Sequence, residues 1–150
     1  MKVVIQRVLE VSVAIEGEKV SQIQNGLLVL VGIENDDSIE DIQWLSKKVV
    51  NLRIFNDEND VMNKSLIDID GDAIVVSQFT LQASTKKGNR PSYLKAAKSE
   101  VSIPLYEQFV GQVEQDLGKK IQTGKFGADM KIALVNDGPV TIIIDSKNRV

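Results

Sequence analysis

Two short polar stretches interrupt otherwise apolar segments of the chain. Ser77, Gln78 and Thr80 follow the apolar run DAIVV, and residues 136–139 (NDGP) separate MKIALV from VTIII. Strand ends often deliver side chains and main-chain amides to binding sites, and a threonine hydroxyl becomes a nucleophile when a base activates it. The first stretch therefore predicts a site at the end of a strand, with fraying of the strand into a polar loop as the alternative.

The chain contains no histidine and no cysteine. A Ser-His-Asp triad, a thiol nucleophile, a disulfide and a Cys/His zinc site are therefore excluded. Neither GxxxxGK[ST] nor GxGxxG occurs, so phosphoryl transfer from nucleotides and dinucleotide redox chemistry have no support. Any catalysis must use carboxylates, hydroxyls, lysine, main-chain dipoles or groups of the substrate, and we expect neither a metal nor a cofactor.

Arg7 is unusual among the residues that share its face of a predicted strand. Residues 3–15 alternate apolar and polar side chains, which predicts a half-buried strand. The apolar face carries Val3, Ile5, Leu9, Val11, Val13 and Ile15. Arg7 is also an odd-numbered residue and therefore belongs to the same face. A buried arginine must meet a carboxylate, carbonyl oxygens or a bound anion. The alternatives are a bulge in the strand or a side chain that reaches back to solvent.

The remaining periodicity predicts an α+β fold. Strands are expected over residues 19–24, 27–33, 72–81, 130–135 and 140–144, and the NDGP segment is expected to be a hairpin turn. One helix is expected over residues 39–53, after a capping-box-like start at Ser38. A second carries a stripe of Tyr106, Phe109, Val110, Val113 and Leu117, and ends at Gly118. We expect a single domain over residues 1–150, with a mostly antiparallel or mixed sheet packed against two main helices.

Charge is unevenly distributed along the chain. Residues 1–72 carry 14 acidic and 7 basic side chains, whereas residues 73–150 carry 7 acidic and 11 basic ones. The basic residues concentrate in segments 86–98 and 119–125. Such patches attract a polyanion even when the net charge is −3, because distant charges are screened. A solvated loop and a solvated helix end are the alternatives.

The apolar content of 43% suits a globular protein with an ordinary core. No apolar run approaches the roughly 20 residues that cross a bilayer. Lys2, Arg7 and Glu10 fall within the first apolar segment, which therefore indicates a strand and not a signal peptide. We expect a soluble cytoplasmic protein without a membrane partner.

The polar stretches resemble the signatures of a known family. SQFTL at 77–81 and NDGPVT at 136–141 are similar to the two signature motifs of the D-aminoacyl-tRNA deacylases (D-tyrosyl-tRNA(Tyr) deacylases). Three shorter segments also match that family: QRV at 6–8, GNRPSY at 88–93 and TGKFGADM at 123–130. The resemblance extends from Met1 to about Asp145, which is nearly the whole chain.

The resemblance implies a homodimer that hydrolyses the ester between a D-amino acid and the 3′ end of tRNA, a chiral proofreading step in translation. Ser77, Gln78, Phe79 and Thr80 would be the catalytic residues, lining the pocket for the terminal adenosine and the ester. Whether Thr80 or the 2′-hydroxyl of the substrate assists catalysis stays open at this point.

Chiral selection would depend on the second motif. The resemblance implies a cis bond between Gly138 and Pro139, and it places this dipeptide of one subunit in the pocket of the other. Asn136 belongs to the same set, and Arg7 would brace the dipeptide. L-aminoacyl-tRNA would be rejected, whereas glycyl-tRNA would be accepted because glycine has no side chain to exclude.

Lys86, Lys87 and Arg90 are the residues expected to contact tRNA. The main alternative function is a non-catalytic tRNA- or RNA-binding protein of the same fold. A second is an editing domain for an L-amino acid, as in the related N-terminal domains of some archaeal threonyl-tRNA synthetases. The intact SQFTL and NDGPVT motifs favour the deacylase.

Overall fold

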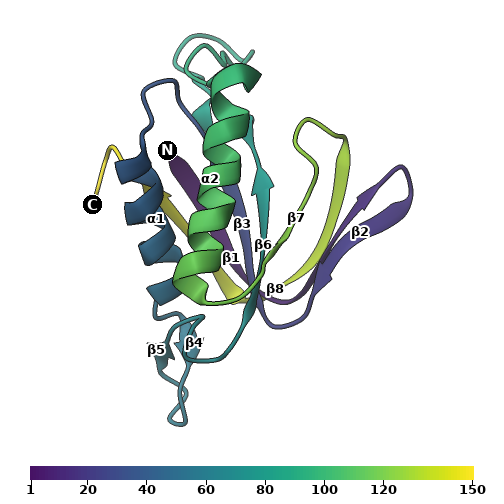
Figure 1. Ribbon diagram of the computed structural model, residues 1–150, viewed down its shortest axis with the longest axis vertical. Helices are drawn as coiled ribbons and strands as arrows, with labels where there is room; N and C mark the ends of the chain where they lie inside the picture. The colour runs from purple at the N-terminus through teal and green to yellow at the C-terminus, as the bar shows by residue number, and fades with distance from the viewer.

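Two helices lie side by side on one face of a strongly curved mixed sheet in the computed structural model, which describes all 150 residues (Figure 1). The strands are β1 (Lys2–Ile15), β2 (Glu18–Ile23), β3 (Gly26–Gly32), β4 (Phe55–Asn56), β5 (Met62–Lys64), β6 (Asp72–Ser77), β7 (Gln122–Thr123) and β8 (Met130–Asp145). The helices are α1 (Ile39–Asn51) and α2 (Ser99–Leu117), and a 3₁₀ turn, η1, spans Phe79–Gln82. Neither helix is long and apolar enough to cross a membrane.

The sheet is built around β1, the longest of its inner strands. On one edge, β1 pairs antiparallel with β3 through its first half and with β2 through its second half. On the other edge it pairs antiparallel with β8 along nearly its whole length. β3 is parallel to β6, and β6 is parallel to β7. The predicted α+β class with a mixed sheet and two main helices is confirmed, and the sheet curls until it is nearly closed.

The curvature produces two apolar cores. The larger lies between the helices and the sheet and includes Val3, Ile5, Leu27, Val29, Leu45, Val49, Tyr106, Phe109 and Val113. The smaller lies within the curl of the sheet and consists of Val8, Val11, Val13, Ile23, Leu28, Ile74 and Val76. Alternate residues of β3 and β6 therefore enter different cores, which explains why both strands are almost continuous apolar runs.

Both helices agree with the sequence pattern. The N–H of Ser38 donates to Asp41 Oδ2 at 2.9 Å, which is one half of a capping box at the start of α1. α1 ends at Asn51, two residues before the predicted end, because Leu52 is extended. α2 ends where Gly118 adopts a φ of 81°, a left-handed conformation that favours glycine.

The sequence predicts that Leu9 lies on the buried face of β1. This prediction is wrong, because Leu9 is 49% exposed. The register between β1 and β8 shifts twice between Gln6 and Glu10. Because side chains alternate along a strand, the shift transfers the buried side chains from one core to the other. Val3 and Ile5 consequently face the helices, whereas Val8 is the first residue that faces the curl.

The predicted hairpin at residues 136–139 is wrong, because β8 continues through this segment as one strand of 16 residues. Its two halves pair with the same partner: Asn136 lies opposite Val8, and Thr141 lies opposite Gln6. Residues 137–140 therefore project from β8 opposite Arg7, and we call them the Gly-Pro bulge. The predicted strand 72–81 is also too long, since β6 ends at Ser77 and the chain turns into η1.

Candidate functional site

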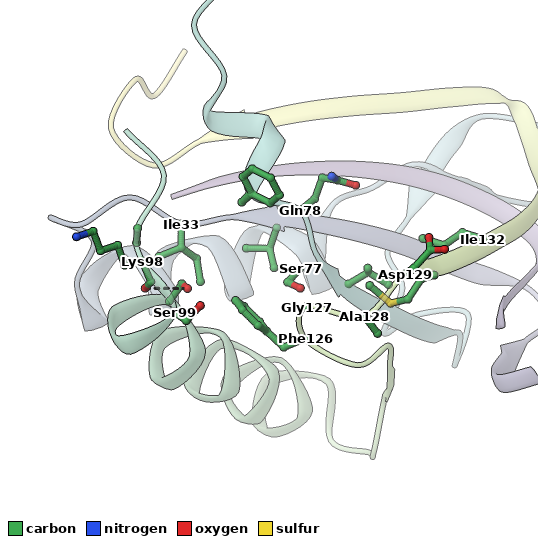
Figure 2. Close-up of a pocket in the computed structure, with 16 residues that line it drawn as sticks. Ile33, Ser77, Gln78, Lys98, Ser99, Phe126, Gly127, Ala128, Asp129 and Ile132 are labelled. Atoms are coloured by element: carbon green, nitrogen blue, oxygen red, sulfur yellow. Dashed lines mark hydrogen bonds between the residues drawn. The ribbon is translucent and has the colours of Figure 1, made fainter. Parts of the chain in front are cut away.

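A cavity of about 530 Å³ opens at the C-terminal end of β6, between this strand, the N-terminus of α2 and the segment before β8 (Figure 2). Its lining consists of Val31, Ile33, Val76, Ser77, Gln78, Phe79, Ala97, Lys98, Ser99, Ser102, Phe126, Gly127, Ala128, Asp129, Met130 and Ile132. The size and the largely apolar lining with a few polar groups are typical of sites for small organic ligands.

The first signature motif forms one wall of this cavity. Of the four residues that the sequence assigns to a site, Ser77, Gln78 and Phe79 line this cavity, whereas Thr80 is not part of the lining. Thr80 Oγ1 accepts a hydrogen bond from Gln78 Nε2 at 2.6 Å. The first bond of η1 runs from Leu81 N–H to the carbonyl oxygen of Gln78 at 3.2 Å. The N–H groups of Phe79 and Thr80 precede it and are free to donate to a ligand, as the first amides of a helical turn are.

The opposite wall was not assigned to the site by sequence reasoning. Residues 126–130 are recognisable only as part of the matching segment TGKFGADM, and Lys98 only as the last cation of the basic segment 86–98. Nothing in the sequence indicates Ser99 or Ser102. Lys98 and Asp129 lie at opposite ends of the cavity in Figure 2. The carboxylate of Asp129 is paired with Lys131 at 2.9 Å.

A buried tyrosine supports Phe126 from behind. The hydroxyl of Tyr106 donates to the carbonyl oxygen of Val75 at 2.8 Å, and its ring centroid lies 5.8 Å from that of Phe126. Burial raises the pKa of Tyr106 to about 12, although a hydrogen bond with Thr123 opposes this shift. Tyr106 is therefore a neutral, fixed contact for one wall of the cavity.

Most of the basic segment 86–98 lies beside the cavity, and only its last residues, Ala97 and Lys98, line it. Phe79 and Tyr93 pack edge to face with ring centroids 5.1 Å apart, which joins the segment to the rim. Ser84 and Ser92 exchange main-chain hydrogen bonds of 2.8 and 2.9 Å and close a loop between them. Lys86, Lys87 and Arg90 are exposed on this loop.

The Gly-Pro bulge is held from beneath by Arg7, which is 7% exposed. Arg7 Nε donates to the carbonyl oxygen of Asp137 at 3.2 Å and lies 3.1 Å from Asp137 Oδ2. Arg7 Nη1 donates to the carbonyl oxygen of Ile54 at 2.6 Å. The expectation that a buried Arg7 meets carbonyl oxygens or a carboxylate is confirmed.

Asn136 closes the base of the bulge. Its Nδ2 donates to the carbonyl oxygens of Arg7 and Val140, each at 3.0 Å. The peptide bond between Gly138 and Pro139 is cis, and both residues are exposed. Gly138 has a φ of +124°, and a Cβ added there would lie 2.9 Å from Arg7 Nη2. Backbone conformation and space therefore both require glycine at this position.

The cavity and the bulge lie at different levels of the sheet. Ser77 pairs with Val31, which in turn lies opposite Val3 on β1. The bulge begins after Asn136, which lies opposite Val8. Val3 and Val8 are five residues apart on one strand, a rise of about 17 Å. The structure thus does not bring the two signature motifs of one chain together.

Comparison with known proteins shows the family of the chain. A sequence model of the family described as D-Tyr-tRNA(Tyr) deacylase matches residues 4–145. A protein of Flavobacterium psychrophilum named D-aminoacyl-tRNA deacylase is 68% identical over 149 residues, which is 99% of each chain. A protein of Bacteroides fragilis with the same name is 65% identical over the same share of each chain.

Solved structures have the same fold. One described as the c-Myc DNA unwinding element binding protein superposes with a TM-score of 0.90 at 39% identity, covering 97% of this chain and 98% of that chain. Another, described as a probable eukaryotic D-amino acid tRNA deacylase, superposes with a TM-score of 0.81 over 95% of this chain and 97% of that one. Its identity is 17%, so it shows the fold alone. On the family match and the bacterial relatives, the chain belongs to the D-Tyr-tRNA(Tyr) deacylase family and is a hydrolase of D-aminoacyl-tRNA.

Proposed function

We propose that the chain acts as a homodimer in which the Gly-Pro bulge of each subunit lies at the mouth of the other subunit's cavity. The observation that carries this proposal is the separation of the two motifs within one chain: the strand register puts Ser77 and Asn136 about 17 Å apart along the strands. A bulge so far from its own cavity is available to a second copy. Two such contacts related by a two-fold axis would complete two sites.

The surface around the bulge supports a second copy as the occupant. β8 is a long edge strand that pairs only with β1. Its residues Val135 and Ile143 are 45% and 67% exposed, and Leu9 of β1 is 49% exposed. Long edge strands with exposed apolar side chains readily bind another chain. In such a dimer, Leu9 would be part of the interface, which would account for an exposed leucine at this position.

The cavity would hold the 3′-terminal adenosine of tRNA and the D-aminoacyl ester attached to it. Phe79 is 56% exposed and Tyr93 is 40% exposed at the rim, where an adenine base would stack on them. Lys86, Lys87 and Arg90 would contact phosphates that approach the same rim. The cytoplasm, where tRNA is charged and used, would be the place of action.

Chiral selection would come from main-chain oxygens of the bulge. With a D-amino acid, only the α-hydrogen would face the oxygens of Gly138 and Pro139, whereas an L side chain would collide with them. A 10⁴-fold rejection needs roughly 5.4 kcal/mol, which a steric wall of rigid backbone can supply. Such a wall excludes L side chains but makes no specific contact with D side chains, so D side chains of many sizes and glycine would be accepted.

Hydrolysis needs a water molecule, donors for the oxyanion and a path for one proton. The water oxygen bonds to the ester carbonyl carbon, the bond to the ribose 3′-oxygen then breaks, and that oxygen takes the proton. The N–H groups of Phe79 and Thr80 would stabilise the oxyanion, and one such donor is worth roughly 2.7–4 kcal/mol. The substrate's 2′-hydroxyl, adjacent to the ester, would carry the proton. Thr80 as nucleophile is disfavoured, because the structure offers no base beside its hydroxyl, which accepts from Gln78.

The test compares the hydrolysis of D- and L-tyrosyl-tRNA by the same preparation. The proposal expects rapid release of D-tyrosine and a rate for the L-ester lower by about 10⁴. A terminal 2′-deoxyadenosine should slow hydrolysis by at least about 10², the usual contribution of a positioned proton carrier. Thr80→Val should retain most of the activity. Equal hydrolysis of both enantiomers rejects the chiral filter, and an inactive Thr80→Val enzyme restores the threonine as nucleophile.

A further inference from the structure

A second groove, of about 420 Å³, lies along the C-terminal half of α1 and apart from the cavity of β6. It is lined by Trp44, Lys47, Lys48, Asn51, Leu52 and Arg53, and we call it the Trp44 groove. The indole of Trp44 has the Arg149 guanidinium carbon 4.3 Å from its ring centroid. Lys48 Nζ lies 5.5 Å from the same centroid. The groove thus combines an aromatic surface with several cations.

The cations of the Trp44 groove are available to an anionic partner. Lys47, Lys48 and Arg53 are exposed, and neither lysine takes part in an ion pair of the structure. Arg53 Nε donates to the carbonyl oxygen of Asn63 at 3.0 Å and leaves its other N–H groups free. Arg149 lies 3.9 Å from the carboxylate of Glu40, so its charge is partly compensated.

The position of the groove relates it to the Gly-Pro bulge. Arg53 directly precedes Ile54, whose carbonyl oxygen accepts from Arg7 Nη1. The same guanidinium donates to the carbonyl oxygen of Asp137 in the bulge. Arg7 therefore contacts both the bulge and the residue that follows the last residue of the groove, so the two features are neighbours. In the proposed dimer, a bulge that enters the partner's cavity would bring the adjacent groove of its own subunit towards that cavity.

We propose that the Trp44 groove binds tRNA beyond its terminal adenosine, contacting the molecule whose 3′ end occupies the partner's cavity. Lys47, Lys48 and Arg53 contact phosphates, and Trp44 provides a surface on which an unpaired base stacks. Trp44 is half-buried, and lysine and arginine around a partly exposed aromatic ring are the chemistry that recognises single-stranded RNA. This inference rests on the proposed function, because the cross-subunit site brings the RNA to this face.

The test compares two variants that change the net charge by the same amount. Lys47→Ala/Lys48→Ala alters the groove, whereas Lys19→Glu alters an exposed lysine of β2 that lies outside both basic segments. The groove variant should raise KM for D-tyrosyl-tRNA about tenfold, and it should lower the slope of log affinity against log salt by about 1 per lysine. Its hydrolysis of D-tyrosyl-adenosine, which has no RNA beyond the adenosine, should be unchanged. The control variant should match the wild type with both substrates.

Trp44→Leu separates stacking from charge. It should weaken the binding of uncharged tRNA, measured by fluorescence anisotropy, with little change in the salt slope. The inference is overturned if the groove variant binds tRNA as the control does, or if KM rises equally for D-tyrosyl-adenosine. Binding of uncharged tRNA needs neither hydrolysis nor chiral selection, so a wild type that fails to discriminate D from L rejects the proposed function and leaves the groove testable.

Discussion

The guanidinium of Arg7 lies 3.1 Å from the carboxylate of Asp137 and donates to the main-chain oxygen of the same residue. The side chain of Arg7 is 9% exposed, whereas that of Asp137 is 39% exposed. One planar cation thus connects the bulge to the carbonyl oxygen of Ile54 in the body of the protein. The shape of the bulge depends on a contact that a smaller cation cannot reproduce.

Arg7→Lys tests this dependence. Lysine keeps the charge but lacks the fork that reaches both Asp137 and Ile54, so the bulge loses its fixed position. We expect the ratio of kcat/KM for D- over L-tyrosyl-tRNA to fall at least about tenfold, which is about 1.4 kcal/mol. Far-UV circular dichroism should show that the fold is retained. An unchanged ratio in a folded variant would remove Arg7 from the account of selectivity.

Gly138→Ala tests the bulge itself. The added methyl group would lie 2.9 Å from Arg7 Nη2 at a φ of +124°, so the bulge must move. We expect L-tyrosyl-tRNA to become a substrate and stability to fall by about 1–3 kcal/mol. Gly111→Ala is the matched control, because that position in α2 has nothing within 4 Å of the added Cβ. The control should be as selective as the wild type and slightly more stable. Full selectivity in Gly138→Ala would contradict the filter.

The bulge also shows what local sequence could not predict. Asn-Asp-Gly-Pro between two apolar runs is a turn signal, and locally the prediction of a hairpin was sound. Both runs nevertheless pair with β1, and this long-range pairing makes one strand of them. The exposure of Leu9 has the same cause, since the register shift opposite the bulge changes which side chains are buried.

The cavity was predictable on one wall only. The polar end of an apolar strand indicates Ser77 and Gln78, because buried polar side chains cost stability unless they form hydrogen bonds. Lys98 and Ser99 approach the cavity only because α2 packs beside β6, and no local pattern encodes that placement. The burial of Arg7 could be predicted because a charge on an apolar face requires partners.

Lys86→Ala/Lys87→Ala/Arg90→Ala tests the loop beside the rim. These side chains are exposed and do not line the cavity. Removing them should raise KM for D-tyrosyl-tRNA more than it lowers kcat, and the effect should shrink at high salt. Steady-state kinetics at two salt concentrations measure both changes. An unchanged KM would show that the loop faces away from the bound tRNA.

The lowered pKa of Asp41 predicts that the protein loses stability in acid. Burial alone would raise its pKa, but hydrogen bonds from Ser146, Ser38 and Lys147 outweigh burial and lower the pKa from 3.8 to about 2. The folded state thus favours the carboxylate, which stabilises the protein at pH values above the unfolded pKa. This contribution is lost as the pH falls from about 4 through 2.

Asp41→Asn isolates that contribution. At pH 7 the variant should be less stable than the wild type by about 1–2 kcal/mol in urea unfolding, since partial exposure of Lys147 screens the pair. At pH 2 most of the difference should be gone, because this pH is far below the unfolded pKa and about half of the folded wild-type carboxylate is protonated. A difference that does not depend on pH would show that Asp41 acts through packing and not through its charge.

The most direct test of the cross-subunit filter is a heterodimer with one open cavity. One chain carries Ala128→Trp, which fills its cavity, and the other carries Gly138→Ala, which damages its bulge. Different C-terminal tags allow the heterodimer to be purified, and its hydrolysis of D- and L-tyrosyl-tRNA is then measured. If the partner supplies the bulge, the open cavity meets an intact Gly138 and rejects the L-ester as the wild type does. A heterodimer as unselective as the Gly138→Ala homodimer would mean that each chain filters its own site, which contradicts the account.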